Sequence, residues 1–427
     1  MPKDKKLLLI QLNEINFNYF KNFIFDNKYK NLKELYNLNY YETYSENEYE
    51  NLEPWIQWFS AVSGLDAKTH KLFHLGDIEK SNVDQIYEII ENKGYKVGAI
   101  SPMNVKNKLK KPAFFIPDPW TKTNPDNNFW SKKIYKAIKQ VVNDNAQSKI
   151  SIESLFILII SFLRFFKINN IFLYLKLILF SKKKPWNKSL FLDLFLHDIH
   201  LSLIKKDLNF SSIFFNAGAH IQHHYFYNMG DEKKKNPKWY IDNKFNPAEE
   251  LFEVYDRIIG NYLTLFKKNI IIATGLSQVP SSKPVYYYRL KNHKKFFQKF
   301  GIIFHEILPR MSRDFLIVFN NKKDADNAAK KILLIQDQFG NKLFKEIDYR
   351  ENSLFVSLTY PNEINEKTKA IFGNIQLNLI NEVSFVALKN GIHSQNGYLF
   401  TSLNIQSNNK TNFHIKKIFE ILDNYFL

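Results

Sequence analysis

Short, uninterrupted apolar segments recur along this chain, and each is followed at once by polar residues. The clearest are Lys6–Leu12, Ser211–Phe215 and Asn269–Thr274. Continuous apolar runs of this length are typical of strands that are buried on both faces. Helical patterns, such as those over Val83–Asn92 and Pro247–Phe266, alternate with them. The sequence therefore predicts an α/β fold in which helices sandwich a mostly parallel sheet.

The pattern divides the chain into three stretches. Residues 1–128 and 209–427 are predicted to form the α/β core, with a small α+β addition around 300–380. Residues 129–208 are predicted to be an inserted helical cap, because helical patterns dominate there.

Two interpretations of the cap remain open. Its apolar runs are interrupted by Arg164, Lys167 and Lys176 before they reach the roughly 20 residues that a membrane-spanning helix needs. The cap could be buried against the core, or residues 154–180 could make a peripheral contact with an anionic membrane surface.

Composition narrows the classes of partner. Apolar residues make up 45 % of the chain and aromatic residues 16 %, which predicts a folded protein. Lys and Arg number 60 against 42 Asp and Glu, a net charge of +18 that favours anionic partners, although an AT-rich genome also produces many lysines. No nucleic-acid recognition motif accompanies the charge, so nucleic-acid binding is not expected.

The absence of cysteine excludes disulfides, thiolate zinc sites and cysteine nucleophiles. The first apolar run, Leu7–Ile10, is too short for a signal peptide. We therefore expect a cytoplasmic protein, with a peripheral position on the inner membrane as the alternative.

Polar residues gather where successive predicted strands end, which is where open α/β sheets place their sites. Three of the eleven histidines, His220, His223 and His224, lie in a stretch of five residues that follows the strand Ser211–Phe215. His220 and His224 are four apart and share a face if the segment is helical. Imidazole is a common metal ligand and a base near neutral pH. A metal site and a histidine-rich surface helix both fit this cluster.

Glu53 precedes a second distinctive segment. Pro54 suits the first turn of a helix and Gly64 the residue after its end, so Glu53 is predicted to lie at a helix N-terminus, where anions are favoured. The residue could act as a nucleophile, a base or only a helix cap. His393 is predicted to lie in a tight loop between Gly391 and Gly397.

The order of these polar groups along the chain resembles that of the alkaline phosphatase superfamily, most closely its type I phosphodiesterase/nucleotide pyrophosphatase branch. The resemblance covers most of the chain. It is carried by Asn13-Glu14 after the first strand, Glu53–Gly64 with His70-Lys71, Asn216–His220, Thr274–Gln278, and Gly391-Ile392-His393.

The chain departs from the family pattern at three places. Pro54 falls on or beside the position of the Ser/Thr nucleophile, with Glu53 and Ser60 as the nearest candidates. Asn216 stands where the family has a metal-binding Asp, and the Asp-His pair of the second metal is missing from Thr274–Gln278. The resemblance thus implies a remodelled site with one divalent metal, zinc or manganese.

The residues expected to hold this metal are Glu14, Asn216, His220 and His393, and those expected to act in catalysis are Glu53, Gln57 and His224. The expected function is a hydrolase or transferase acting on a sugar- or nucleotide-linked phosphate ester. The alternative is an inactive protein of this fold that binds a phosphorylated glycan or a partner protein in surface-polysaccharide biosynthesis.

Overall fold

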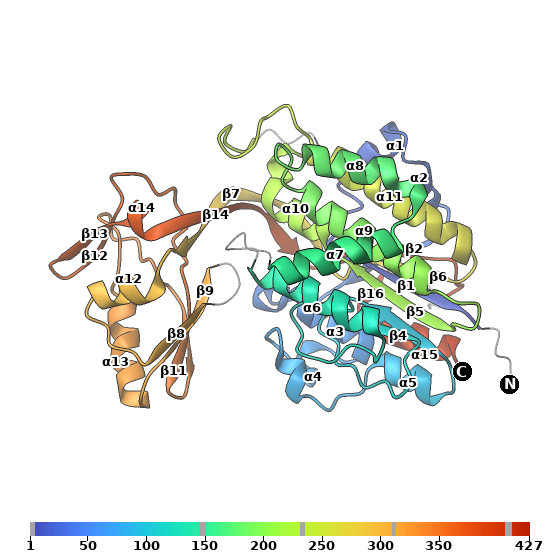
Figure 1. The fold of residues 1–427 in the computed structure, drawn as a ribbon, viewed down its shortest axis with the longest axis horizontal. Coiled ribbons are helices and arrows are strands. Elements are labelled where there is room, and N and C mark those ends of the chain that lie inside the picture. The colour runs from blue at the N-terminus through green and yellow to red at the C-terminus, as the bar shows by residue number, and fades with distance from the viewer. Residues whose placement is uncertain (1–4, 145–150, 231–234, 310–312, 406–411) are drawn as a thin grey trace. The chain divides into compact units, whose positions relative to one another are not determined.

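The computed structural model describes residues 5–144, 151–230, 235–309, 313–405 and 412–427. The chain divides into two compact units (Figure 1). The first comprises Met1–Val142, Ile150–Ser281 and Gly391–Leu427, and the second comprises Asn143–Lys149 and Ser282–Asn390.

An eight-stranded sheet forms the centre of the first unit, in the order β16-β2-β15-β6-β1-β5-β3-β4. Its strands are β1 (Leu7–Leu12), β2 (Asn39–Tyr44), β3 (Val97–Ile100), β4 (Phe114–Ile116), β5 (Phe210–Phe215), β6 (Ile270–Ala273), β15 (Asn396–Thr401) and β16 (Asn412–His414). Every pairing is parallel except those of β15, which runs antiparallel to β2 and β6. The predicted mostly parallel α/β sheet is confirmed.

Both faces of the sheet are covered by helices. On β1, Leu8, Ile10 and Leu12 belong to one apolar core and Leu7 and Leu9 to another, because alternate side chains of a strand point to opposite faces. The first core is closed by α2 (Lys30–Leu35), α9 (Asn187–Leu203), α10 (Ala217–Tyr225) and α11 (Pro247–Phe266), and the second by α3 (Pro54–Ser63), α5 (Ile86–Asn92) and α15 (Lys417–Tyr425). Such burial on both faces explains the uninterrupted apolar runs in the sequence.

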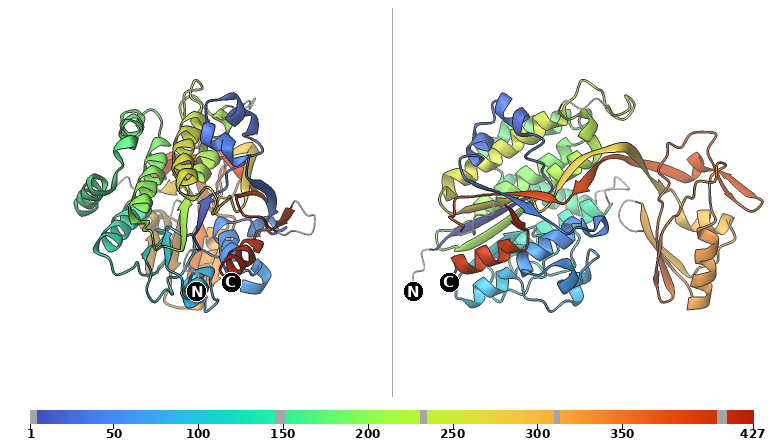
Figure 2. Two further views of the ribbon diagram at one scale, coloured as in Figure 1. Left: turned by 90° about the vertical axis from the view of Figure 1, so that its right-hand side faces the viewer. Right: turned by 180° about the vertical axis from the view of Figure 1, so that it is seen from behind.

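The helices between β4 and β5 belong to the same unit as the sheet. They are α6 (Phe129–Asp144), which belongs to it as far as Val142, α7 (Ile152–Phe165), α8 (Ile171–Phe180) and α9. Both α7 and α8 pack on α9, so they lie farther from the sheet than α9 does, at the outer side of this unit (Figure 2). Two short helices, α1 (Lys21–Asp26) and α4 (Ala67–His70), complete the unit.

The second unit contains a four-stranded antiparallel sheet in the order β10-β11-β9-β8. Its elements are α12 (His293–Lys299), β8 (Glu306–Pro309), β9 (Asp314–Val318), α13 (Lys322–Ile332), β10 (Ile347–Arg350), β11 (Ser353–Ser357), the β12–β13 pair (Lys369–Phe372, Ile375–Asn378) and α14 (Leu379–Glu382). Two paired strands, β7 (Ser277–Leu290) and β14 (Val383–Ser394), connect the units.

The topology brings distant segments to one edge of the central sheet. The parallel strands β1, β5 and β6 end at Leu12, Phe215 and Ala273, so the residues that follow them share this edge. Because β15 is antiparallel to β6, its first residue lies at the same edge, directly after the end of β14. His393 is therefore part of a strand, β14, and not of the tight loop that the sequence predicted.

Candidate metal centre

Glu14 is the central residue of the polar group at this edge. The backbone N–H groups of Asn13 and Glu14 donate to the carbonyls of Phe215 and Thr274, at 3.0 Å each, and so extend the ladders of β1 with β5 and β6. At Glu14 the backbone turns into the left-handed region, with φ 62°. This conformation is uncommon for a residue with a side chain and is found preferentially at functional sites.

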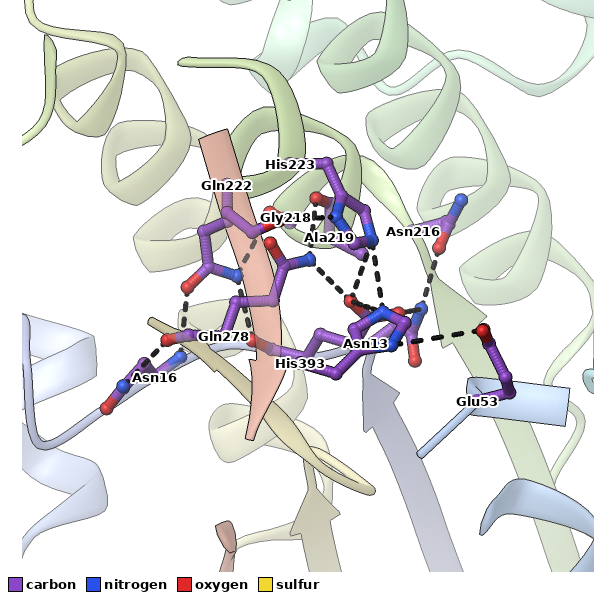
Figure 3. Close-up of polar contacts among 12 residues, drawn as sticks. Asn13, Asn16, Glu53, Asn216, Gly218, Ala219, Gln222, His223, Gln278 and His393 are labelled. Atoms are coloured by element: carbon purple, nitrogen blue, oxygen red, sulfur yellow. Dashed lines mark hydrogen bonds and ion pairs between the residues drawn. The ribbon is translucent and has the colours of Figure 1, made fainter. Parts of the chain in front are cut away.

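Three donor atoms form a nearly equilateral triangle here. Glu14 Oε2 lies 3.1 Å from His223 Nε2 and 3.2 Å from His393 Nε2, and the two Nε2 atoms are 3.3 Å apart (Figure 3). The Glu14 carboxylate is 1 % exposed. This cluster combines residues from the end of β1, from α10 and from β14, and we call it the Glu14 triad.

The Glu14 carboxylate also accepts hydrogen bonds from two side-chain amides. Asn13 Nδ2 donates to Oε1 at 3.0 Å, and Gln278 Nε2 donates to Oε2. Burial raises the pKa of Glu14, but the charges of His393 and His223 and their hydrogen bonds outweigh it and hold the pKa well below its usual range. The carboxyl group is therefore an anion at neutral pH, as a metal ligand must be.

Helix α10 is fixed at its beginning by groups from two neighbouring helices. The Asp193 carboxylate, in α9, accepts from Ala217 N at 2.9 Å. The Tyr255 hydroxyl, in α11, donates to Asp193 and accepts from Gly218 N. A Cβ on Gly218 would come within 2.1 Å of Ile15 Cδ1, so a larger residue there would have to displace the Ile15 side chain. These contacts set the rotation of α10 about its axis, and hence which of its histidines faces Glu14.

Gly391 allows β14 to approach α10. A Cβ at this position would come within 2.4 Å of both the Gln222 carbonyl oxygen and Gln278 Oε1. The Gly391 carbonyl oxygen lies 3.4 Å from His223 Nδ1. Residues two apart in a strand share a face, so this contact brings His393 to the same side of β14, next to His223.

Both ring nitrogens of His223 face acceptors, the Gly391 carbonyl at Nδ1 and the Glu14 carboxylate at Nε2. A protonated His223 donates to both, and a metal at Nε2 would take the place of the proton between His223 and Glu14 while Nδ1–H still donates to Gly391. A lone pair that faces a carboxylate is stabilised by a cation or a proton between the two. An Nδ1–H···O=C contact that leaves Nε2 available is common among metal-binding histidines.

Glu53 lies beside the triad. The predicted helix is confirmed as α3, with Pro54 in its first turn and Gly64 after its end at φ 74°. Glu53 occupies the N-cap position, but its side chain makes no capping hydrogen bond; its Oε2 lies 3.9 Å from His393 Nδ1 (Figure 3). The side chain is 34 % exposed, so it can be reached from solvent.

Besides Glu53, four residues that the sequence places in the site lie outside the triad. Asn216 Oδ1 accepts from Asn13 Nδ2 at 2.9 Å and reaches Glu14 only through that amide. His220 and His224 share a face of α10, as expected, and contact each other, with ring centroids 4.8 Å apart. Gln57 is fully buried and donates to the Asn51 carbonyl at 2.8 Å. In the described residues, the group able to hold a metal comprises Glu14, His223 and His393.

Ser60, another candidate nucleophile, faces His70, with 3.1 Å between Oγ and Nε2. However, His70 Nδ1 accepts from Leu72 N at 3.0 Å, so in the neutral ring the proton lies on Nε2 and is donated to Ser60. Burial lowers the pKa of His70 to about 4. This histidine therefore does not present a lone pair to Ser60, and the pair does not form an activated nucleophile.

The triad fits a divalent metal. Two donors bound at about 2.0–2.1 Å to one tetrahedral zinc lie about 3.3 Å apart, close to the three distances observed. One carboxylate and two imidazoles that leave a position open are a known catalytic zinc set and also suit other first-row metals. The residues that would hold the metal are Glu14, His223 and His393, with Asn13 and Gln278 orienting the carboxylate.

Sequence reasoning did not assign His223 or Gln278 to the metal site. His223 belongs to the histidine cluster, and Gln278 follows β6 at the same edge, so both were recognised as polar groups near the site. The spacing of four residues favoured His220 and His224 instead. Gly391 is the residue in the sequence that could have pointed to His223. Because it lacks a Cβ, β14 can approach α10 next to His223.

Comparisons with known proteins give structural similarity only. No protein-family model matches the sequence, and no curated protein matches it. Murine ectonucleotide pyrophosphatase/phosphodiesterase 5 shows 9 % identity and a TM-score of 0.41, with 99 % of this chain and 95 % of that chain covered. Phosphonoacetate hydrolase from Sinorhizobium meliloti 1021 shows 10 % identity, 99 % and 96 % coverage and a TM-score of 0.46.

Alkaline phosphatase from the Antarctic bacterium TAB5 shows 10 % identity, 99 % and 98 % coverage and a TM-score of 0.39. All three proteins are members of the alkaline phosphatase superfamily, which is the family that the sequence motifs resemble.

Proposed function

We propose that this chain is a hydrolase or transferase that acts on a phosphate ester and uses one divalent metal, zinc or manganese, held by the Glu14 triad. The observation that carries the proposal is the triangle of 3.1, 3.2 and 3.3 Å between one buried carboxylate oxygen and two imidazole nitrogens. The resemblance of the motifs to alkaline phosphatases supports phosphoryl chemistry.

When bound, such a metal supplies a Lewis acid that polarises a phosphoryl oxygen. Asn13 and Gln278 hold the Glu14 carboxylate by donating to its two oxygens. His223 and His393 are held by the Gly391 contact and by α10. These residues fix the positions of the donors before substrate arrives.

In this proposal Glu53 is the residue that reacts with the substrate. It is partly exposed and lies beside the triad, at the beginning of a helix whose N-terminal end favours phosphate. It would accept a proton from an attacking hydroxyl or attack phosphorus itself. The structure gives no comparable position to Gln57 or His224, so neither has a role in the proposal.

A phosphate ester with a sugar or nucleotide group is the substrate class that we propose. The chain's net charge of +18 attracts such an anion. The alternative function is binding, without turnover, of a phosphorylated glycan or of a partner protein in surface-polysaccharide biosynthesis. It would use the same edge of the sheet.

The decisive experiment is elemental analysis of the purified full-length protein before and after incubation with zinc or manganese. The wild type is expected to hold close to one metal, and His223→Ala and His393→Ala are expected to lose it. His220→Ala is the matched control, because His220 lies on the same helix but outside the triad. Hydrolysis of bis(p-nitrophenyl) phosphate should follow the metal content.

A wild type that takes up no metal would contradict the one-metal site, since a protonated histidine bonded to Glu14 would then explain the same distances. Metal binding without hydrolysis of any phosphomonoester or phosphodiester tested would favour the binding protein. A peripheral membrane contact of residues 154–180 is a separate proposal, because it depends on side chains outside this site.

A further inference from the structure

Helices α7 and α8 present an apolar face outward. The exposed large apolar side chains of this segment, here called the α7–α8 face, are Ile152, Leu155, Phe156, Ile159, Ile160, Leu163, Ile168, Phe172, Leu175, Ile178, Leu179 and Phe180. Ile152, Phe172 and Leu179 are 88 %, 83 % and 75 % exposed. So many exposed large apolar side chains in one short segment are rare on a protein that meets only water.

Helix α7 is apolar on its outward side as well as on its inward side. It buries Ile157 and Phe165 together with Ser154 and Ser161, and Ser161 Oγ has no hydrogen-bond partner among the described residues. Phe156 and Leu163 are exposed on the other side. A water-facing helix normally carries polar residues there, so packing within this chain does not account for the outward face.

The segment that carries the face has more basic than acidic residues. Between Ser151 and Leu190 the only acidic residue is Glu153, which pairs with Lys136 at 2.7 Å. The basic residues of this stretch are Arg164, Lys167, Lys176, Lys182, Lys183, Lys184 and Lys188. Lys176 and Lys184 form ion pairs with Glu253 and Glu250 of α11. Lys182 and Lys183 are exposed at the end of α8 and form no ion pair within the part of the chain that the structure describes.

Helices α7 and α8 do not form one straight apolar helix. In the described residues no single helix is long and apolar enough to span a membrane, and the pair Ile152–Phe165 and Ile168–Phe180, which passes that test together, is bent by 112°. Helices of 14 and 10 residues are about 21 and 15 Å long, shorter than the roughly 30 Å of the hydrocarbon core.

We propose that the α7–α8 face docks on the surface of an anionic lipid bilayer, with α7 and α8 lying in the interface. Their apolar side chains enter the boundary between headgroups and acyl chains, and the lysines after α8 contact the headgroups. This inference is independent of the proposed function, because none of its residues belongs to the Glu14 triad. If both proposals hold, the proposed phosphate-ester site belongs to a protein held at a membrane.

The test is co-sedimentation of the full-length protein with vesicles of phosphatidylcholine, with and without phosphatidylglycerol. We expect binding to the anionic vesicles that weakens at high salt. The triple variant Leu163→Ser, Phe172→Ser, Leu179→Ser should bind at least about tenfold more weakly, and Lys182→Gln with Lys183→Gln should remove most of the salt dependence. The control is Leu265→Ser, Ile303→Ser, Phe339→Ser, which changes three exposed apolar residues elsewhere.

Circular dichroism of each variant checks that the fold is kept. Failure of the wild type to bind anionic vesicles, equal binding to neutral ones, or equal losses in the two triple variants would overturn the proposal. Sedimentation without vesicles tests the other occupant, a second copy of this chain. A wild-type dimer that the first triple variant dissociates, with no vesicle binding, would also overturn it.

Discussion

The Nε2 atoms of His223 and His393 lie 3.3 Å apart, although 170 residues separate them in the chain. One histidine comes from a helix and the other from a strand that begins in the second unit. Their meeting depends on Gly391, the point where β14 touches the backbone of α10. Glu14 is then placed by the end of β1 at 3.1 and 3.2 Å from these two atoms.

Gly391→Ala is expected to separate the two histidines. The new Cβ would come within 2.4 Å of the Gln222 carbonyl oxygen, so β14 must move away from α10. We expect a loss of about 1–3 kcal/mol in the free energy of unfolding and at least about tenfold weaker metal binding, measured by denaturant titration and by competition with a chromophoric chelator. Gly340→Ala is the control for metal binding: its φ of 84° strains an alanine, so stability falls there too, but the new Cβ meets no atom within 4 Å and metal affinity should stay unchanged. Equal metal affinity in both variants would show that the contact does not position the site.

Glu14→Gln keeps the size of the side chain and removes its charge. Removing a residue that only hydrogen-bonds to a metal ligand typically lowers metal affinity by about 10–100-fold. Removing a direct anionic ligand should therefore weaken metal binding by more than about 100-fold. Gln278→Ala removes the amide that donates to the Glu14 carboxylate and to the Ala219 carbonyl but leaves the carboxylate itself, so its loss should fall within the smaller range. The same competition assay measures both. If Glu14→Gln binds metal as the wild type does, the carboxylate is not a ligand.

Glu53→Gln should separate catalysis from metal binding. Its Oε2 is 3.9 Å from His393 Nδ1, outside the triad, so metal content should stay close to that of the wild type. If Glu53 is the base, kcat on bis(p-nitrophenyl) phosphate should fall by about 10²–10⁴. Glu50→Gln, which changes an exposed carboxylate just before α3, is the control. An unchanged kcat would remove Glu53 from the mechanism.

His70 gives a stability change with pH that does not involve the metal centre. Its ordinary pKa is 6.5, and burial lowers the pKa in the folded protein to about 4. Between these values the unfolded chain binds a proton that the folded chain does not, so this contribution to stability is lost as pH falls from about 6.5 to 4. His70→Asn, which keeps an acceptor for Leu72 N, should flatten the dependence of Tm on pH in that window. A curve parallel to the wild type would contradict the assignment.

Local patterns in the sequence determined the parts of the structure that depend on burial and on chain geometry. Continuous apolar runs specified β1, β5 and β6, because strands covered on both faces need no polar side. Pro54 and Gly64 fixed the ends of α3, because their backbone conformations suit those two positions. Since parallel strands end at one edge, Glu14 could be assigned to that edge from the strand pattern. His393 was assigned to the same site through the resemblance of Gly391-Ile392-His393 to the family motif, and it lies in β14.

Only the tertiary structure decided which histidine of α10 joins them. The rotation of that helix is set by Asp193, Tyr255 and Gly218, contacts between segments that are distant in sequence. The exposure of the α7–α8 face was likewise undecided, because the same apolar pattern suits a buried cap and an outward face. Periodicity shows which residues share a face, but only packing against the rest of the chain shows where that face points.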